Sequence, residues 1–327
     1  MDTERMYLAD NSFALTAEEL TPEDLESAKH FVETTRHLQE IHSLFSVFKF
    51  NIDVLQKEYV LMNSGKVFCD EKPANNAQDY IAINAYITNI ISAGKTLADS
   101  MECYVKSNSR IDSAVRKKYL DFYHNTYSTS FAYKLLIRLR DYAQHGHLPV
   151  SSEGNNYYFD LVQIVNKPHY NHNKTLEAEM KSIIDEIITV YKDTPTIALT
   201  ESLAEFVVNL IAIYKQYLHC VRDELEEGYD QFQNIISAYP QNVLNTNGIA
   251  FFVYDVEDGN AHIVNTADDP LEMLRSFEEE AERLYNDYAQ AYKTVMSGNL
   301  YVQCTDEELL IGPGEMLADN MVQTNQD

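Results

Sequence analysis

The longest run of apolar residues at helical spacing limits the fold of this chain more than any other feature. Between residues 203 and 235 apolar side chains recur every three or four positions, the spacing of one face of an α-helix. They are Leu203, Phe206, Leu210, Tyr214, Tyr217, Val221 and Leu225, with Ile235 further along. Pro240 predicts that this helix ends before it. A helix of this length buries its apolar face against other helices, which predicts a helical bundle.

Other segments show the same periodicity. The sequence "TPEDLESAKHF" begins a helix, because Thr21 can cap it and Pro22 suits the first helical position. Apolar residues at helical spacing predict further helices over residues 41–59, 83–104, from Asp112 to about residue 140, and over 175–191. In the helical region that starts at Asp112, the polar, β-branched "HNTYSTS" predicts a kink or a break into two helices.

Minor β structure is predicted in two places. The segment "NNYYFDLVQIV" after Pro149 has the pattern of a short strand, and "GIAFFVYDVEDGNAHIVN", with a hairpin near 250–265, alternates like two strands around an Asp258-Gly259 turn. A capped helix then starts at Asp269-Pro270 and runs to Gly298. The fold class is therefore mainly α, an up-and-down helical bundle with minor β structure. Residues 1–240 form the bundle, 241–303 a hairpin-plus-helix segment that can belong to the same domain, and 304–327 a mobile acidic tail.

Composition excludes several classes of function. With 51 acidic and 25 basic residues, a formal net charge of −26 opposes non-specific binding to polyanions. The most apolar stretch carries Glu205 and Lys215, so a buried helix explains it better than a membrane span, and an N-terminus without a signal sequence predicts a cytoplasmic protein. The four cysteines lie far apart, and P-loop, dinucleotide-binding and zinc-protease motifs are absent from the sequence. His169 and His172 are the nearest approach to metal-ligand spacing but have no acidic or cysteine partner nearby, so neither a metal nor a cofactor is predicted.

One segment has the opposite charge. Between Tyr104 and His147 eight basic residues face three acidic ones, a net charge of +5. Such a basic band can hold a phosphate locally, and Arg116, Lys117, Lys118 and Lys134 are its candidate RNA-binding residues. Six tyrosines in the same span could stack on unpaired bases or could be core residues of a tyrosine-rich chain. Because helix C-termini favour cations, part of the band also has a structural explanation.

Within this segment, "RDYAQH" places Arg140 and His145 in the pattern R-x-x-x-x-H, with Asp141 directly after the arginine. The motif resembles the R-x(4-6)-H motif of HEPN domains, helical bundles many of which are ribonucleases. The resemblance implies a metal-independent ribonuclease whose site lies at a two-fold interface. One His145 would take the proton from a ribose 2′-hydroxyl, the second would protonate the 5′-oxygen, and Arg140 would stabilise the phosphorane. The products would be 2′,3′-cyclic phosphate and 5′-hydroxyl ends.

Helix geometry adds a condition. Residues five apart on a continuous helix point about 140° away from each other. Arg140 and His145 therefore converge only if Gly146 loosens the last turn or a second copy shares the site. Arg138 with His145, and Arg140 with His147, are alternative pairings, and Asp141 either orients one of these groups or is an exposed helix-end carboxylate.

Three functions remain open. The first is a homodimeric endoribonuclease, a toxin or defence effector by family analogy, with tRNA or mRNA as its substrate and an antitoxin or other regulatory protein as a further partner. The second is a non-catalytic helical module for dimerisation or protein interaction. The third is an acidic nucleic-acid mimic that inhibits a nucleic-acid-binding protein, suggested by the charge of −26. None of the three involves a membrane.

Overall fold

The computed structural model describes residues 21–59, 77–144, 146–153, 156–166, 174–186, 188–189, 195–238 and 269–295, and the backbone of six short strands outside these ranges. Its helices are α1 (Pro22–Tyr59), α2 (Ala77–Ser107), α3 (Ser113–Thr129), α4 (Phe131–Gln144), α5 (Leu161–Val165), α6 (Lys174–Glu186), α7 (Leu199–Ala238) and α8 (Pro270–Val295). This part of the chain confirms the predicted class, mainly α with minor β structure.

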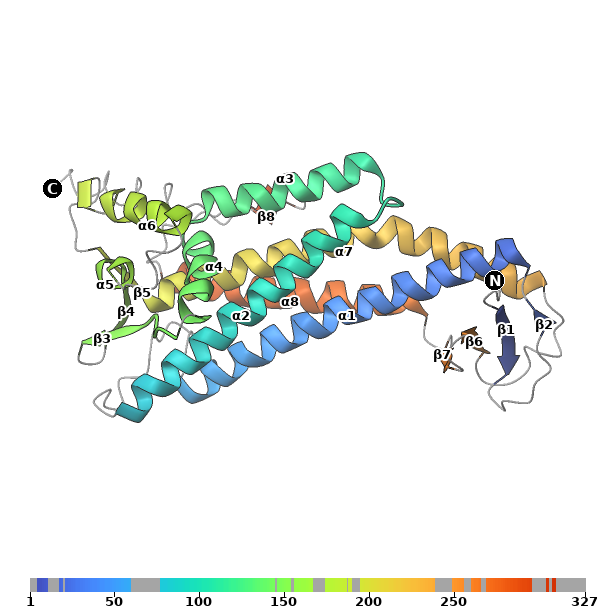
Figure 1. Cartoon of the computed structure of the whole chain (residues 1–327), viewed down its shortest axis with the longest axis horizontal. Coiled ribbons are helices and arrows are strands. Elements are labelled where there is room, and N and C mark those ends of the chain that lie inside the picture. The colour runs from blue at the N-terminus through green and yellow to red at the C-terminus, as the bar shows by residue number, and fades with distance from the viewer. Residues whose placement is uncertain are drawn as a thin grey trace.

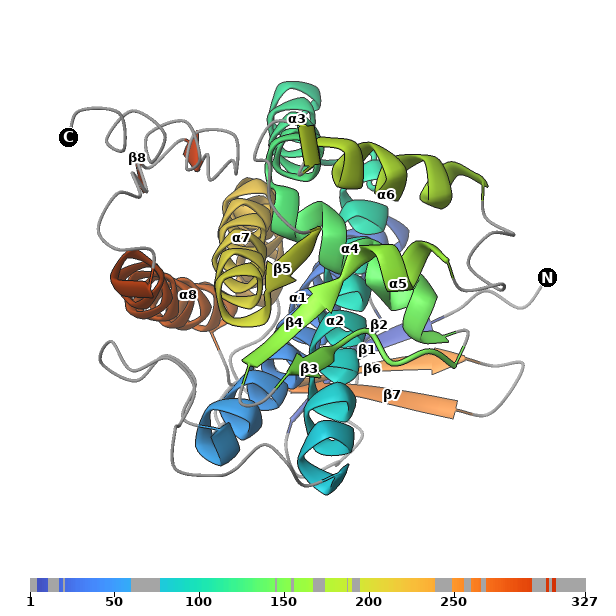
Figure 2. The same cartoon turned by 90° about the vertical axis from the view of Figure 1, so that its left-hand side faces the viewer.

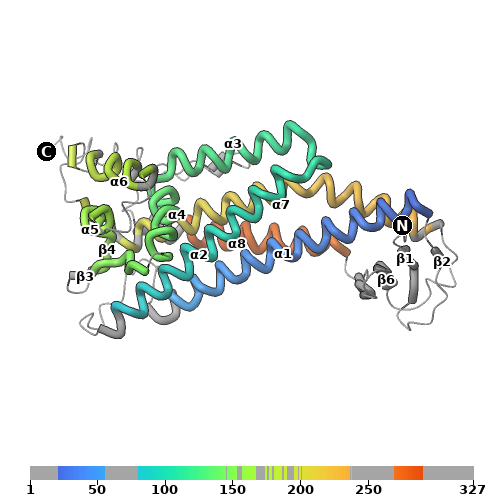
Figure 3. Tube along the Cα trace, viewed as in Figure 1, coloured from blue at the N-terminus to red at the C-terminus, as the bar shows by residue number. Residues whose placement is uncertain are grey.

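Helix α7 is the centre of the bundle. It packs against α1, α2, α3, α4 and α8, and α1, α2, α7 and α8 run along the length of the molecule (Figures 1 and 3). Viewed from one end, α7 lies between α8 and the α2–α4 side (Figure 2). Every residue from Ser202 to Tyr214 is buried, as expected for a helix covered on all sides. None of the described helices combines the length and apolar character needed to cross a bilayer.

Side-chain caps fix the helix starts that the sequence predicts. The backbone N–H of Asp24 donates to Thr21 Oγ1 at 3.2 Å at the start of α1. Asp112 accepts from the N–H of Ala114 at 2.9 Å at the start of α3, and Asp269 accepts from the N–H of Leu271 at 2.8 Å at the start of α8. These bonds satisfy donors that the first turn of a helix leaves without partners.

The predicted break in the third helical region is confirmed at Ser130. Its backbone is extended, with φ −85° and ψ 112°, and separates α3 from α4. The Ser130 hydroxyl donates to the buried Glu205 of α7 and accepts from the N–H of Tyr133 at 3.2 Å. Because the break is held to the central helix, α4 runs across the long axis of the bundle instead of continuing α3 (Figure 1).

A small antiparallel sheet follows α4. Strands β3 (Ser151–Glu153), β4 (Asn156–Asp160) and β5 (Thr196–Ala198) pair in the order β3-β4-β5. The strand predicted in "NNYYFDLVQIV" is confirmed over β4 but ends at Asp160, and the second half of that segment forms α5. The reason is local: the Asp160 side chain accepts from the N–H of Gln163 at 2.8 Å and caps a helical turn.

The predicted hairpin is confirmed by the pairing of β6 (Ile249–Asp255) with β7 (Asn260–Asn265). Strand β6 also pairs with β1 (Arg5–Asp10), which in turn pairs with β2 (Glu18–Glu19), a contact that the sequence did not predict. The short strands β8 (Cys304–Thr305) and β9 (Glu308–Leu309) pair with each other. Asp258-Gly259 and Gly298 lie outside the described residues, as does the rest of 304–327.

Helix α8 belongs to the main hydrophobic core. Its Ala281, Tyr285 and Tyr288 join the same buried cluster as the apolar faces of α1, α2 and α7. Ion pairs bind its opposite edges to the bundle: Lys49 of α1 contacts Glu280 at 2.6 Å, and Lys215 and Arg222 of α7 pair with Glu282 and Glu278. The division of the chain near residue 240 stays a prediction.

Candidate functional site at the end of α4

The last turn of α4 carries Arg140 at the border between buried and exposed surface. The apolar face of the helix, which includes Leu136, Leu139 and Tyr142, is buried in the core. The Arg140 side chain is 28% exposed, and Nη1 lies 3.9 Å from Asp141 Oδ1. Within the described part of the chain, its buried Nε has no hydrogen-bond partner. An arginine presents five N–H donors, so this guanidinium has donors left for a ligand.

The chain turns sharply directly after α4. Gly146 has φ +83°, in the left-handed region that favours glycine, and its N–H donates to the carbonyl of Ala143 at 3.0 Å. The sequence left two ways for Arg140 and His145 to converge, a last turn loosened at Gly146 or a site shared by two copies. The structure has a sharp turn at Gly146, and the convergence stays a prediction. His145 stands between Gln144 and Gly146 in the chain but lies outside the described residues, so its part in the site stays a prediction.

The segment that leaves the motif is held to α2. The side chain of Asn84 donates to the carbonyl of Val150 at 3.2 Å and accepts from the Val150 N–H at 2.9 Å, and both residues are buried. The His147 ring, half-buried in this segment, packs against the buried Tyr142 ring with 4.8 Å between centroids. The end of α4, which carries the motif, is therefore followed by a segment that hydrogen bonds from α2 hold in place.

Arg138 is engaged elsewhere. Its Nε donates to the hydroxyl of Tyr127 at 2.6 Å, and its guanidinium lies 5.4 Å from the centroid of that ring. Residues two positions apart on a helix are rotated by about 160° from each other. Arg138 and Arg140 therefore lie on different sides of α4. The structure links Arg138 to α3 and does not bring it together with Arg140.

The candidate RNA-binding residues do not form one surface. Arg116 donates to the backbone carbonyls of Asn108 and Ile111 and so holds the α2–α3 connection. Lys117 and Lys118 are exposed nearby, whereas Lys134 lies in the first turn of α4. Ser130 follows Lys117 by thirteen positions, about 20 Å along the helix. Of the four candidate RNA-binding residues, only Lys134 is on α4 together with Arg140, whereas Arg116, Lys117 and Lys118 lie toward the other end of α3.

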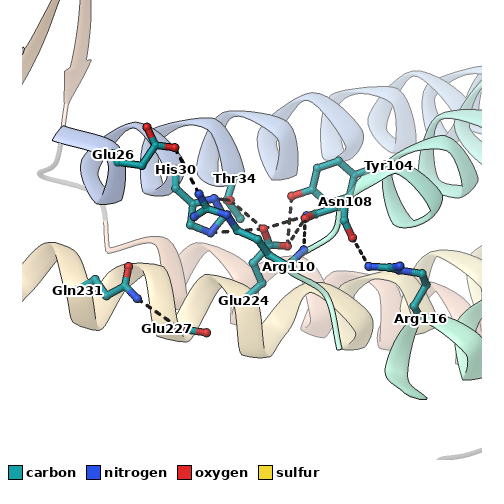
Figure 4. A network of polar contacts seen from close by, with 10 residues as sticks. All are labelled: Glu26, His30, Thr34, Tyr104, Asn108, Arg110, Arg116, Glu224, Glu227 and Gln231. Carbon is teal, nitrogen blue, oxygen red and sulfur yellow. Dashed lines mark hydrogen bonds and ion pairs between the residues drawn. The ribbon is translucent and has the colours of Figure 1, made fainter. Parts of the chain in front are cut away.

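A buried polar network that the sequence did not predict surrounds Glu224 of α7 (Figure 4). The Asn108 amide donates to both carboxylate oxygens, at 2.8 and 2.7 Å. The hydroxyls of Thr34 and Tyr104 donate at 3.3 Å, and His30 Nε2 lies 3.5 Å away. The network therefore ties α1, α2 and the α2–α3 connection to the central helix.

His30 is held neutral in this network. Burial, and then the Arg110 guanidinium, lower the pKa of His30 to about 4, although Glu26 opposes them. Burial is also the main reason that the pKa of Tyr104 is raised. Glu224 lies nineteen residues, or about 28 Å, along α7 from Glu205, which contacts the start of α4. The network is thus separate from the motif and is a structural element of the bundle.

The described residues contain no group of three or more His, Cys, Asp and Glu side chains able to hold a metal ion. His169 and His172 fall outside the described residues. Comparisons with protein-family models, with curated proteins and with solved structures found no match. The resemblance to HEPN domains therefore rests on the motif itself.

Proposed function

We propose that the chain is a metal-independent endoribonuclease with its active site at the end of α4. The observation that carries the proposal is the Arg140 guanidinium, which is partly exposed and has a buried Nε without a partner among the described residues. Arg138 and Arg116, in contrast, already donate to Tyr127 and to backbone carbonyls, although the buried Nε of Arg116 also has no partner among the described residues. Of the three arginines, Arg140 is the one whose only described polar contact is the ion pair with Asp141.

The position of Arg140 suits a phosphodiester substrate. A guanidinium can donate two parallel hydrogen bonds to phosphate oxygens, and in a partly buried place this contact is stronger than in water. The negative end of the α4 dipole lies at this terminus and favours a cation there even without a ligand. A ligand phosphate would contact the exposed part of the Arg140 side chain, because Nε itself is buried.

The chemistry follows from the motif. His145 takes the proton of the ribose 2′-hydroxyl, whose oxygen attacks the adjacent phosphorus, and a second His145 protonates the departing 5′-oxygen. The pKa of an imidazole near neutral suits both steps. Arg140 binds the phosphorane oxygens as their charge increases. The RNA strand breaks into 2′,3′-cyclic phosphate and 5′-hydroxyl ends, and the biological role of a toxin or defence effector follows from family analogy alone.

RNA cleavage with a chelator present tests this function. We expect Arg140→Ala and His145→Ala each to lower the rate by about 100-fold or more, and a substrate with a 2′-deoxy sugar at the cleavage position to remain intact. Arg138→Ala and His147→Ala are the matched controls, since the alternative pairings would make one of them as damaging. Circular dichroism verifies that all four variants fold. Equal activity in wild type and all variants would exclude this site.

A non-catalytic interaction module is the second candidate, favoured by a different observation. Phe50 and Ile81, on the outer side of α1 and α2, are 66% and 60% exposed. Exposed large apolar side chains that lie together, unlike single ones, are typical of surfaces that bind another protein, and α1 and α2 pack against each other. An interaction module would keep its partner after Arg140→Ala and would leave RNA intact in every variant.

A further inference from the structure

The outer side of α1 and α2 exposes large apolar side chains. Phe50 is 66% exposed, Ile81 60% and Val47 52%, and they are the most exposed large apolar residues in the described part of the chain. After Ile81, α2 presents smaller, exposed or half-buried side chains about one turn apart at Ala85, Thr88 and Ser92. We call this surface, made by the outer sides of residues 43–54 and 81–92, the α1/α2 face.

The α1/α2 face carries little charge in a highly charged protein. Residues 43–54 and 81–92 contain one lysine and one aspartate, the exposed Asp53, whereas the 23% charged content of the chain would place about five or six charged residues there. The lysine is Lys49, which contacts Glu280 of α8 at 2.6 Å and so points away from this face.

We propose that the α1/α2 face binds the same face of a second copy of this chain. Two copies that each carry −26 repel each other, so contact costs least where carboxylates are few. A basic partner would be attracted to the acidic helix surfaces and would gain little from a face with a single carboxylate. Self-association through one shared patch is also the commonest arrangement of homo-oligomers, in which a two-fold axis relates the copies.

The direction of the two-fold axis follows from the acidic residues. Glu23, Asp24 and Glu26 lie at the start of α1, far along the helix from Phe50. An axis in the plane of the face and perpendicular to the helices places the two acidic ends at opposite ends of the dimer. The small residues Ala85 and Ser92 then allow the paired helices to approach closely.

The α1/α2 face is also next to the motif. Ile81 precedes Asn84 by one turn, and the Asn84 side chain holds Val150, which follows Gly146 by four residues. With the axis at the level of Thr88, the two Asn84 residues lie about 12 Å apart along the helix direction. The second copy therefore lies beside the segment that leaves the motif, as a shared site requires; this step rests on the proposed ribonuclease function.

The molar mass of the full chain, measured by light scattering without RNA, tests the interface. We expect about 75 kDa, twice the 37.6 kDa of one chain, for wild type. Phe50→Glu and Ile81→Glu each give the mass of one chain, whereas Val162→Glu, at a 41% exposed apolar residue of α5, keeps the dimer. Phe50→Leu also keeps the dimer, because it preserves the apolar surface.

Hydrogen exchange of wild type at high and low concentration gives an independent readout that needs no variant. Protection of residues 43–54 and 81–92 increases on association, and that of α5 does not. A monomeric wild type overturns the interface, as does a dimer that survives both glutamate substitutions or dissociates equally after Val162→Glu. If the protein is a dimer but leaves RNA intact, the ribonuclease function is wrong and the interface stands. If it is a monomer that cleaves RNA, the interface is wrong and the ribonuclease function stands.

Discussion

The side chain of Asn84 makes both backbone hydrogen bonds of Val150, donating to its carbonyl at 3.2 Å and accepting from its N–H at 2.9 Å. An extended neighbouring strand would satisfy Val150 in the same way. Here a single helical residue replaces the strand, because the segment that leaves α4 enters the core before β3 begins. Both residues are fully buried, so neither backbone group can bond to bulk water instead.

Asn84→Ala leaves the N–H and C=O of Val150 without partners in the interior. We expect the free energy of unfolding to fall by about 2–4 kcal/mol, since each unsatisfied buried group costs about 1–3 kcal/mol. Urea denaturation measures the loss, and amide exchange at Val150 becomes faster. Asn89→Ala, at an exposed position of the same helix, is the control and changes stability little. Equal effects of the two substitutions would show that the bonds to Val150 contribute nothing.

Replacement of two glycines by alanine is expected to change the stability of the protein in opposite directions. A Cβ at Gly94 in α2 would lie 2.8 Å from Phe206 Cζ and 3.0 Å from Leu210 Cδ2, both in buried side chains of α7. Gly94→Ala should therefore destabilise the protein by about 1–3 kcal/mol. At Gly228 the nearest atom is Phe31 Cδ2 at an ordinary 3.7 Å, so Gly228→Ala should stabilise α7 by about 0.5–1 kcal/mol. Thermal unfolding of both variants tests the pair, and a shift of the same sign in both would contradict the close approach of α2 to α7.

Asn108→Ala removes the shortest hydrogen bonds to the buried Glu224 carboxylate. The remaining donors, Thr34 and Tyr104, are 3.3 Å away. A hydrogen bond to a charged group contributes about 1.5–3 kcal/mol, so we expect a loss of about 2–3 kcal/mol in unfolding free energy. Asn125→Ala, on the exposed side of α3, is the matched control in the same denaturation experiment. If both variants unfold like wild type, the network does not stabilise the α2–α3 connection.

Stability should fall in mild acid because of His30. Its folded pKa is lowered to about 4 while the unfolded chain titrates near 6.5, so the unfolded state binds more protons between these values. The contribution of the neutral His30 to the free energy of unfolding is complete above pH 6.5 and is lost as the pH falls toward 4. Thr34, Arg110 and Glu26 also face the ring, and the nearby Glu224 carboxylate favours its protonated form, so we expect a modest loss of about 1 kcal/mol between pH 7.5 and 5.

His30→Gln is the variant that isolates this effect, because it removes the titrating ring but keeps a polar side chain. Denaturation of wild type and variant at both pH values gives the comparison. The stability of the variant should depend less on pH over this range. Parallel pH dependence in the two proteins would mean that other groups cause the acid sensitivity.

The features that the sequence predicted are those with local signals. Apolar periodicity and caps such as Asp112 and Asp269 act within a few residues, and so the helices and the break at Ser130 were predictable. The strand after Pro149 was predicted too long because Asp160 starts a helical turn within an apolar run. The bonds of Asn84 to Val150 and of Asn108 to Glu224 join residues 66 and 116 positions apart, and no local pattern indicates such pairs.

In the candidate site, too, local features could be predicted from the sequence and the spatial relations between distant residues could not. The sequence indicated Arg138, Arg140 and the residues from Arg116 to Lys134 as one basic band, since charge counted along the chain ignores direction. Helical rotation places Arg138 against Tyr127 and leaves Arg140 on another side of α4, and the length of α3 separates Lys117 from the motif. The turn lies at Gly146, where the sequence allowed the last helical turn to loosen, because glycine suits a positive φ.

Mixing wild type with an inactive variant should reveal whether two chains share one active site. If each chain supplies Arg140 and His145, equal amounts of wild type and His145→Ala form wild-type dimers as about one quarter of all dimers after exchange, so the cleavage rate falls to about half that of unmixed wild type. The matched control is the double variant Phe50→Glu, His145→Ala, which cannot enter the proposed dimer and should leave the rate unchanged. A rate that is unaffected by either addition, although fluorescence transfer between labelled chains shows exchange, would mean that each chain contains a complete site.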